Sequence, residues 1–310
     1  MSHLALGAGG EFDAIRRLTA LWGEQAQGIG DDAAVLTVPP GRSLVVSTDV
    51  SVEEVHFRRA WLTPEEIGWR ATAAALSDLA AMGAEPLGVL WAGVIPDAWR
   101  DALDGLALGV GAATRHAGAA VVGGDLSRGV ALSLGLTVLG AAARPLTRAG
   151  AKPGDVVWVT GRFGGPARAL AAWEHGGRPT DDDRARFARP VPRIAQGLAA
   201  AAAGATAAID VSDGLAQDAG HLAAASGVRI ELRLDDLPLV PGGEPLAAAA
   251  GGEEYELVLT APVSVDLAAA LPPGVPVTRV GRVVMGHGVV TSLGDRVVEV
   301  VPGHDHFSRP

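Results

Sequence analysis

Strand-like and helix-like segments alternate along most of this chain, and that alternation limits the fold classes open to it. The β-branched run at 43–57 predicts a strand that ends near Asp49, and the apolar run at 86–95 predicts another strand. Between them, residues 63–66 read Thr-Pro-Glu-Glu, a capping box that begins a helix, and a further helix is expected around 97–117. The other strands expected in this half are at 121–125 and 130–140, and the glycine-flanked segment 28–36 is expected to turn into one more. Such alternation favours an α/β or α+β fold.

A turn-rich connector interrupts the pattern near the middle of the chain. Residues 143–155, ARPLTRAGAKPGD, have neither a helical nor a strand period, and the alternation resumes after them. The chain has 310 residues, which is long for one hydrophobic core. We therefore expect two domains, at residues 1–146 and 147–310.

Positive charge is scarce and comes almost entirely from arginine. The formal net charge is -10, which argues against a nucleic-acid partner because phosphate-backbone binding needs clustered cations. Lys152 is the only lysine, and without a G-x-x-x-x-G-K-[ST] run a P-loop is excluded. The V-A-I-K and H-R-D sequences of protein kinases are also missing. If this chain handles phosphate, metal ions and arginines must do so.

Apolar stretches are interrupted too often to span a bilayer. Hydrophobic residues make up 48% of the chain, but Asp, Arg or Gly breaks each apolar run before about 18 residues. The first ten residues lack the features of a secretory signal, and the chain has no cysteine to oxidise. We expect a soluble, cytoplasmic enzyme with no membrane partner.

Several carboxylates lie in surroundings that would not solvate them. Asp78 occurs in ATAAALSDLAAMGA, and the nearest cation in sequence, Arg70, is two helical turns away. A buried, unpaired carboxylate costs several kcal/mol, so it needs a metal ion, a distant arginine or a neighbouring loop that it can cap. The same pattern recurs after apolar strands or glycine turns at Asp31, Asp32, Asp49, Asp125, Asp210 and Asp213.

This recurrence indicates a magnesium site. Hard oxygen ligands that converge at strand ends are what Mg²⁺ needs to bind together with substrate phosphates. Nearby glycines would let the backbone approach phosphates, or simply form turns. A His/Cys zinc site is excluded because the chain has no cysteine and its histidines are scattered.

Ordered sequence blocks extend the pattern over nearly the whole chain. They are GEF at 10–12, GIGDD at 28–32, STD at 47–49, HF at 56–57, LSDLAAMGA at 76–84, GGD at 123–125, R-x-G-A-x-x-G-D at 148–155, IDVSDGL at 209–215, GGEEYEL at 251–257 and DHF at 305–307. Together they resemble the thiamine-monophosphate kinase family, within the superfamily that includes aminoimidazole-ribonucleotide synthetase and selenophosphate synthetase. LSDLAAMGA and D-x-SDGL are typical of the superfamily, whereas STD with HF and the GGE-x-YEL block are typical of the kinase.

The resemblance implies an α/β amino-terminal domain that dimerises through its sheet, and an α+β carboxy-terminal domain. It implies a homodimer that phosphorylates thiamine monophosphate with ATP and several Mg²⁺ ions. The matching magnesium positions are Asp32, Ser47, Thr48, Asp49, Asp78, Asp125, Asp210 and Asp213. The matching ATP positions are Gly124, Asp125, Arg148 and Ser212, and the thiamine phosphate positions are His56, Glu253 and His304. The expected catalytic residues are Asp78, Asp210 and Asp213, and of these Asp78 and Asp210 are expected to act as metal ligands rather than as proton acceptors.

Three positions depart from the family pattern. Glu254 stands where the family usually has Asp, and Gly164-Gly165-Pro166 replaces a Gly-Asp-Ser turn. His304 stands where an aromatic residue is usual. Two other functions are weighed against the kinase: an ATP-dependent synthetase of the same superfamily that phosphorylates an amide or amidine oxygen, and a non-catalytic regulator that binds Mg-nucleotide.

Overall fold

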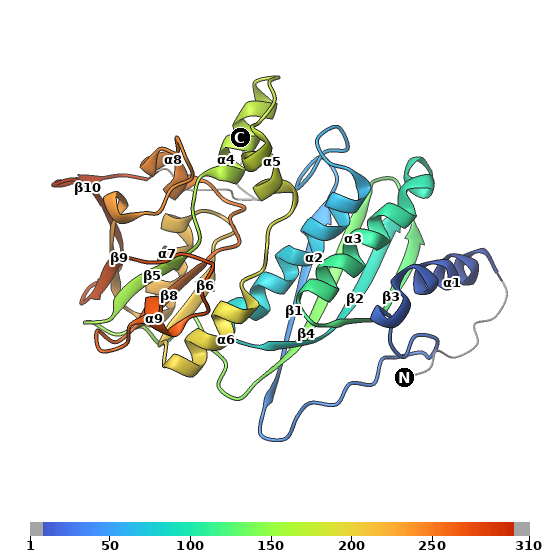
Figure 1. Ribbon diagram of the computed structural model, residues 1–310, viewed down its shortest axis with the longest axis horizontal. Helices are drawn as coiled ribbons and strands as arrows, with labels where there is room; N and C mark the ends of the chain where they lie inside the picture. Colours follow the sequence, from blue (N-terminus) through green and yellow to red (C-terminus); the bar gives the residue numbers. More distant parts are fainter. Residues whose placement is uncertain (1–8, 301–310) are drawn as a thin grey trace. The chain divides into compact units, whose positions relative to one another are not determined.

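The computed structural model describes residues 9–300, which form two compact units (Figure 1). Unit 1 contains the chain up to Leu79 together with Glu85–Ala143. Unit 2 contains Ala80–Ala84 and the chain from Arg144 onward. The domain division at 146 and 147 remains a prediction about which segments fold independently.

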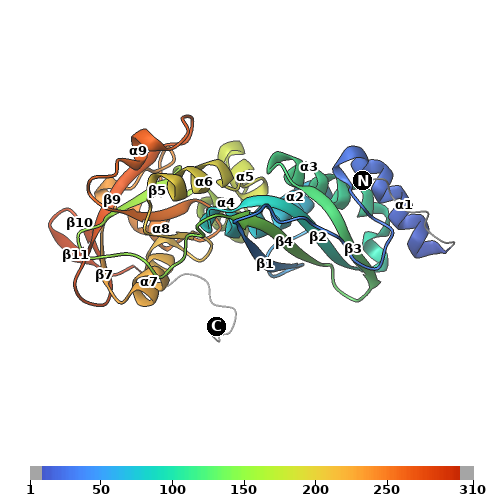
Figure 2. The same ribbon diagram turned by 90° about the horizontal axis from the view of Figure 1, so that it is seen from below.

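Unit 1 is a four-stranded sheet with helices on one face. Its strands are β1 (Ser43–Val52), β2 (Glu85–Ile95), β3 (Ala120–Arg128) and β4 (Ser133–Ala142), in the order β1-β4-β2-β3. The β2–β3 pair is parallel and the other two pairs are antiparallel. The helices are α1 (Gly10–Trp22), η1 (Gly23–Gln25), α2 (Pro64–Ala81), η2 (Asp97–Ala102) and α3 (Leu103–His116). Figure 2 shows α2 and α3 on the same side of the strands.

The capping box predicted for α2 is confirmed. The backbone N–H of Thr63 donates to Glu66 Oε2 at 2.8 Å, and the N–H of Glu66 donates to Thr63 Oγ1 at 3.3 Å. Glycines then allow α2 and α3 to pack closely. A Cβ on Gly68 would lie 2.1 Å from the carbonyl oxygen of Leu106, and one on Gly109 would lie 2.0 Å from that of Glu65. Because the backbones nearly touch, the two helices form a rigid layer over the sheet.

Two strands of unit 1 run further than the sequence pattern predicts. The strand expected to end near Asp49 continues to Val52, because β4 pairs with it along its whole length. The strand expected to end at Asp125 continues to Arg128 beside β2. Both aspartates are therefore mid-strand residues, and the pleat of the sheet decides which face each one occupies.

The prediction of a strand within residues 28–36 is wrong. Residues 34–39 have no regular secondary structure. The segment runs into Pro39-Pro40, and proline cannot donate a hydrogen bond to a sheet.

Unit 2 is a seven-stranded mixed sheet with helices on both faces. Its strands are β5 (Val156–Thr160), β6 (Ala207–Asp210), β7 (Arg229–Arg233), β8 (Leu257–Ala261), β9 (Val277–Val284), β10 (Gly288–Leu293) and β11 (Arg296–Val298), in the order β11-β10-β7-β9-β5-β8-β6. The helices are α4 (Gly165–Glu174), α5 (Asp181–Ala188), α6 (Ile194–Ala203), α7 (Leu215–Ser226), η3 (Leu234–Asp236), α8 (Pro245–Ala250) and α9 (Leu267–Ala270).

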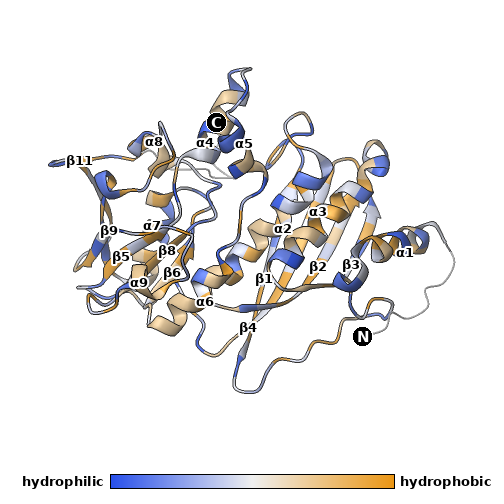
Figure 3. Cartoon of the chain, viewed as in Figure 1, coloured by the Kyte–Doolittle hydropathy of each residue, from blue (hydrophilic) through white to orange (hydrophobic). Residues whose placement is uncertain are grey.

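Alternate side chains of β5 build two hydrophobic cores in unit 2. Val157 packs with Leu222 of α7 on one face of the sheet, and Trp158 packs with Ala200 of α6 and Leu267 of α9 on the other. Figure 3 shows apolar residues along the strands of both units. The mixed sheets with packed helices confirm the predicted α/β and α+β fold class.

None of the helices in residues 9–300 has the length and apolar character needed to cross a membrane. α2, the longest of them at 18 residues, carries Glu65, Glu66, Arg70 and Asp78.

Candidate active site

Three of the predicted magnesium ligands lie on the helix-covered face of the sheet in unit 1. The hydroxyl of Ser47 on β1 donates to Asp78 Oδ2 of α2 at 2.5 Å. Asp49 follows Ser47 by two residues on β1, so its side chain lies on the same face. All three residues are half-buried. A strand and a helix therefore bring two carboxylates and a hydroxyl to one side of the sheet.

The other predicted ligands of unit 1 lie by the opposite face. The hydroxyl of Thr48 is 3.1 Å from that of Thr137 on β4, and Asp125 is exposed, with Ser127 Oγ donating to its Oδ2 at 3.0 Å. A cavity of about 950 Å³ in unit 1 is lined by Asp32, Gly124, Asp125 and Thr137. These residues are brought together there, and the sheet separates them from Ser47, Asp49 and Asp78.

Gly124 needs to be glycine for a local reason. Its φ is 156°, and a Cβ would lie 1.9 Å from the carbonyl oxygen of Trp91 on the neighbouring strand. The backbone of β3 can therefore approach β2 closely at the wall of the cavity. Apolar residues, including Leu18 and Trp22, form the rest of that wall beside the acidic groups.

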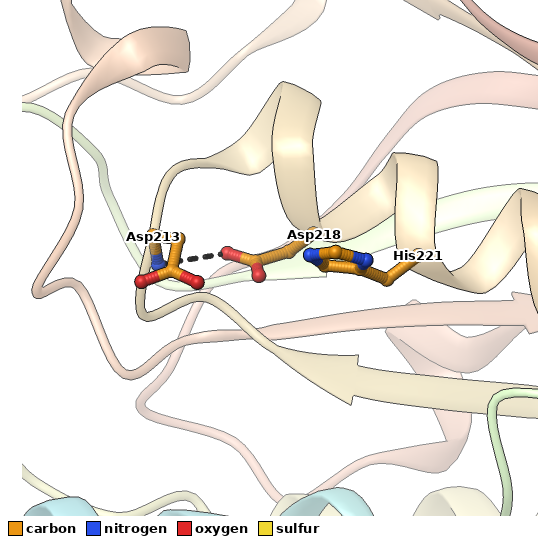
Figure 4. A group of neighbouring side chains, drawn as sticks. All are labelled: Asp213, Asp218 and His221. Carbon is orange, nitrogen blue, oxygen red and sulfur yellow. Dashed lines mark hydrogen bonds between the residues drawn. The ribbon is translucent and has the colours of Figure 1, made fainter. Parts of the chain in front are cut away.

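In unit 2, a buried aspartate holds the loop between β6 and α7 (Figure 4). One oxygen of Asp218, Oδ2, accepts hydrogen bonds from the backbone N–H groups of Ser212, Asp213 and Gly214, each at 3.1 Å. Asp218 is only 2% exposed. Its carboxyl lies at the amino-terminal end of α7, where a negative group is stabilised by the helix dipole. These three hydrogen bonds hold the loop that carries Ser212 and Asp213, both of which were predicted as site residues.

Negative charge accumulates around this loop. Burial, together with the negative charge of Asp210, raises the pKa of Asp218 from 3.8 to about 7. His221 lies one helical turn after Asp218, and ligand atoms of Asp213, Asp218 and His221 lie within 4.8 Å of one another (Figure 4). The carboxylate and hydroxyl oxygens of this loop and of the Ser47 group suit a hard cation such as Mg²⁺.

The GGEEYEL segment lies directly against the same loop. The N–H of Glu253 donates to the carbonyl oxygen of Ser212, and the N–H of Tyr255 donates to that of Val211, both at 2.8 Å. The Tyr255 hydroxyl donates to Glu253 Oε2 at 2.7 Å. Both residues have positive φ, 68° for Glu253 and 52° for Tyr255, which is uncommon for residues other than glycine and is concentrated at functional sites. Unit 2 thus places Glu253 beside Ser212 and Asp213.

The remaining predicted residues are positioned by local contacts. His56 accepts a hydrogen bond at Nδ1 from the N–H of Val52, 3.1 Å away, which leaves the proton of a neutral ring on Nε2. Arg148 is exposed, and its carbonyl oxygen accepts from Ser226 Oγ at the end of α7 at 2.7 Å. His304 lies outside the described residues.

Asp218 and His221 were not among the residues predicted from the sequence. A carboxylate in the first turn of a helix that follows an Asp-Gly turn is a helix-start signal, and it could have identified Asp218. His221 is an exposed histidine on a helix, and no pattern in the sequence distinguishes it.

Comparison with known proteins gives matches along most of the chain. Residues 30–142 match the family model described as AIR synthase related protein, N-terminal domain, and residues 152–293 match the corresponding C-terminal domain. Thiamine-monophosphate kinase of Salmonella typhimurium is 36% identical over 304 residues, 91% of this chain and 92% of its own length. The chain belongs to the thiamine-monophosphate kinase family.

Solved structures of the thiamine-monophosphate kinase family share its fold along almost the whole chain. The crystal structure of thiamine-monophosphate kinase from Stenotrophomonas maltophilia superposes with a TM-score of 0.80 at 35% identity, covering 95% of this chain and 99% of the other. The structure of AaThiL complexed with AMPPCP and TMP superposes with a TM-score of 0.77 at 31% identity, covering 96% and 97%.

Proposed function

We propose that this chain transfers the γ-phosphoryl group of ATP to thiamine monophosphate, giving ADP and thiamine diphosphate. The observation that carries the proposal is the 36% identity to a thiamine-monophosphate kinase across 91% of the chain. AaThiL, which is 31% identical, binds AMPPCP, an ATP analogue, and TMP. That complex supports ATP and thiamine monophosphate as the two ligands of this chain.

The chemistry needs positioning more than a general base. The acceptor is a phosphate whose second pKa is about 6, so near neutral pH it is already a largely deprotonated nucleophile. The harder task is to bring two polyanions together in a chain of formal net charge -10. Groups that neutralise or clamp phosphate oxygens therefore carry most of the catalysis.

Mg²⁺ is the cation that we propose for this task. Several ions are expected, and the residues that would hold them form separate groups: Ser47, Asp49 and Asp78 on one face of the sheet in unit 1, Asp32, Thr48 and Asp125 by the other face, and Asp210 and Asp213 in unit 2. When bound, Mg²⁺ would offset charge on the phosphate oxygens of donor and acceptor. The all-oxygen donor groups at Ser47–Asp78 and at the Asp210–Asp213 loop support this choice.

We assign the ligand contacts on the same grounds. Gly124, Asp125, Arg148 and Ser212 would contact ATP. A guanidinium can bind phosphate oxygens through two parallel hydrogen bonds, which suits Arg148 in a chain with a single lysine. His56, Glu253 and His304 would contact thiamine monophosphate, and a carboxylate such as Glu253 suits the positive thiazolium ring.

A homodimer and a cytoplasmic location complete the proposal. Leu44, Val46 and Val50 alternate along β1 on the face opposite the helices, and all three are exposed, as is Val94 of β2. An apolar sheet face of this kind suits pairing with a second copy. A cytoplasmic location agrees with ATP as co-substrate and with a chain that has no cysteine.

A product assay tests the proposal. The purified chain is incubated with Mg-ATP and thiamine monophosphate, with an aminoimidazole-ribonucleotide precursor, or with no acceptor, and phosphorus NMR follows the products. The proposal predicts ADP and thiamine diphosphate with the first acceptor only. Turnover of the precursor instead would favour the synthetase, and tight Mg-ATP binding with no product would favour the regulator.

A further inference from the structure

Two buried glutamates lie beneath the turn that follows β5. Glu254 Oε1 accepts a hydrogen bond from the N–H of Gly164 at 2.5 Å. Glu256 Oε2 accepts from Thr160 Oγ1 at 2.7 Å, and Thr160 Oγ1 accepts from the N–H of Leu257 at 2.8 Å. The exposed fractions are 8% for Glu254 and 3% for Glu256. The turn at 161–165 and the segment 253–256 are therefore joined by buried hydrogen bonds.

The turn is shaped to fit these carboxyl groups. Gly161 and Gly164 have φ values of 71° and 101°, a backbone region that favours glycine. A Cβ on Gly161 would lie 1.8 Å from Glu256 Oε1, and one on Gly165 would lie 2.4 Å from Cδ of Arg186. Because Gly161 has no side chain, the backbone of the turn can lie directly against the Glu256 carboxylate. In this position the N–H of Gly164 reaches the carboxyl group of Glu254.

The two glutamates differ in their charge partners. Glu256 forms a bidentate ion pair with Arg193, with N–O distances of 2.7 and 2.5 Å. The charged groups around Glu254 are Glu256, Asp183 and Arg186, and Asp183 is itself paired with Arg168 at 3.1 Å. Burial, reinforced by Glu256 and Asp183 and opposed by Arg186 and the Gly164 N–H, raises the pKa of Glu254 from 4.5 to about 8. Near neutral pH Glu254 is mostly a neutral acid.

Glu254 lies between Glu253 and Tyr255, both of which have left-handed backbone. Glu253 and Tyr255, on either side of it, are bonded through their N–H groups to the loop at Ser212 and Val211. The side chain of Glu254 points the opposite way, to the turn at Gly164. A strained backbone persists only where several surrounding contacts stabilise it. Here the loop at 211–212 binds the N–H groups of Glu253 and Tyr255, and the turn at Gly164 binds the side chain of Glu254.

We propose that Glu254 is a positioning residue for the acceptor: its carboxyl bonds the segment 253–255 to the turn at 161–165 and thereby sets the orientation of the Glu253 carboxylate. This rests on the proposed function, in which Glu253 contacts thiamine monophosphate. Shortening Glu254 by one methylene removes its reach to Gly164, whereas Glu254→Gln retains the reach, an acceptor oxygen and a neutral group.

The test compares Glu254→Asp and Glu254→Gln with the wild type. The matched control is Ile230→Val, which removes one buried methyl group from the core of the same unit and leaves Glu254 and its bond to Gly164 in place. Two quantities are measured: KM for each substrate, and hydrogen exchange of peptides that cover residues 161–166. We expect Glu254→Asp to raise KM for thiamine monophosphate about fivefold, to leave KM for ATP within about twofold, and to speed exchange in the turn about tenfold.

Glu254→Gln gives a second test, the pH dependence of KM for thiamine monophosphate, which a merely structural role of Glu254 would not change. KM for thiamine monophosphate should rise between pH 7 and 9 in the wild type, as Glu254 ionises beside Glu256 and Asp183. In Glu254→Gln it should rise less, and at pH 7 that variant should match the wild type.

Each contrary result has a distinct meaning. Faster exchange in Glu254→Asp with unchanged KM would overturn the positioning role, and unchanged exchange would overturn the bond between the two segments. A KM increase in Ile230→Val equal to that in Glu254→Asp would show a general stability effect and overturn the proposal. A wild-type chain that does not phosphorylate thiamine monophosphate would refute the proposed function instead, and the exchange comparison would still decide whether Glu254 holds the turn.

Discussion

The hydroxyl of Ser47 lies 2.5 Å from Asp78 Oδ2 and joins β1 to α2 across 31 positions of sequence. Asp78 is thus a half-buried carboxylate in the apolar second half of α2, and a second oxygen group orients it. This pair is suited to binding a metal ion, because the hydroxyl can orient the carboxylate and can also bind the ion through its own oxygen.

The first prediction is that Asp78 acts through metal binding. Asp78→Asn should lower turnover at least about tenfold, equivalent to about 1.4 kcal/mol of barrier, because an amide binds Mg²⁺ more weakly than a carboxylate. Asp210→Asn should behave in the same way. Higher Mg²⁺, or Mn²⁺ in its place, should recover part of the loss, and the pH–rate profile should keep its wild-type shape.

The control for these variants is Asp104→Asn, which removes a carboxylate from a surface ion pair with Arg17. Its turnover should stay close to that of the wild type. An Asp78 variant that binds metal normally but loses the basic limb of its pH–rate curve would show that the residue is a proton acceptor.

The second prediction concerns the cations near the connector. Arg148→Ala should raise KM for ATP markedly, whereas Lys152→Ala should matter less. Both side chains are exposed and only four residues apart, so Lys152 controls for the loss of one positive charge in this segment. Steady-state kinetics at varied ATP provide the comparison, and near-wild-type values for both variants would remove Arg148 from the site.

The third prediction separates acceptor contacts from nucleotide contacts. His56→Ala and Glu253→Ala should impair the use of thiamine monophosphate about tenfold or more in kcat/KM, while Mg-ATP binding measured by calorimetry stays nearly unchanged. Tyr255→Phe, which removes only the hydroxyl that donates to Glu253, should have a smaller effect in the same direction. Loss of ATP affinity as large as the catalytic loss would contradict this division of roles.

The fourth prediction uses the buried carboxyl of Asp218. Its native pKa of about 7 exceeds its ordinary value of 3.8, so the folded chain retains a proton that the unfolded chain has released between these values. The contribution to stability is fully present below about pH 4 and is lost as pH rises through 7. In EDTA, the melting temperature of the wild type should therefore fall between about pH 4 and 7 relative to that of Asp218→Asn, and parallel curves would contradict the assignment.

Local signals in the sequence predicted much of the secondary structure. The capping box at Thr63 and Glu66 depends on residues three positions apart, so the sequence contains all the information needed for it. The ordered blocks identified the family for the same reason, because they are continuous stretches.

The site was harder to predict because it depends on pairing between distant segments. Asp49 and Asp125 looked like strand-end residues, but β4 and β2 extend the pairing beyond them and the pleat assigns them to opposite faces. In the sequence, Glu254 stood out only as a residue that replaces the usual Asp of the family, and its bond to Gly164, 90 positions away, depends on the tertiary fold. The burial that raises the pKa of Asp218 likewise exists only in the folded chain.

The fate of the γ-phosphoryl group tests the central claim most directly. The purified chain is incubated with Mg²⁺, thiamine monophosphate and ATP labelled with ³²P in the γ-position, and the products are separated by chromatography. Direct transfer predicts that the label appears in thiamine diphosphate in an amount equal to the ADP formed, with little label in inorganic phosphate. Label released as inorganic phosphate, with thiamine monophosphate unchanged, would contradict the account.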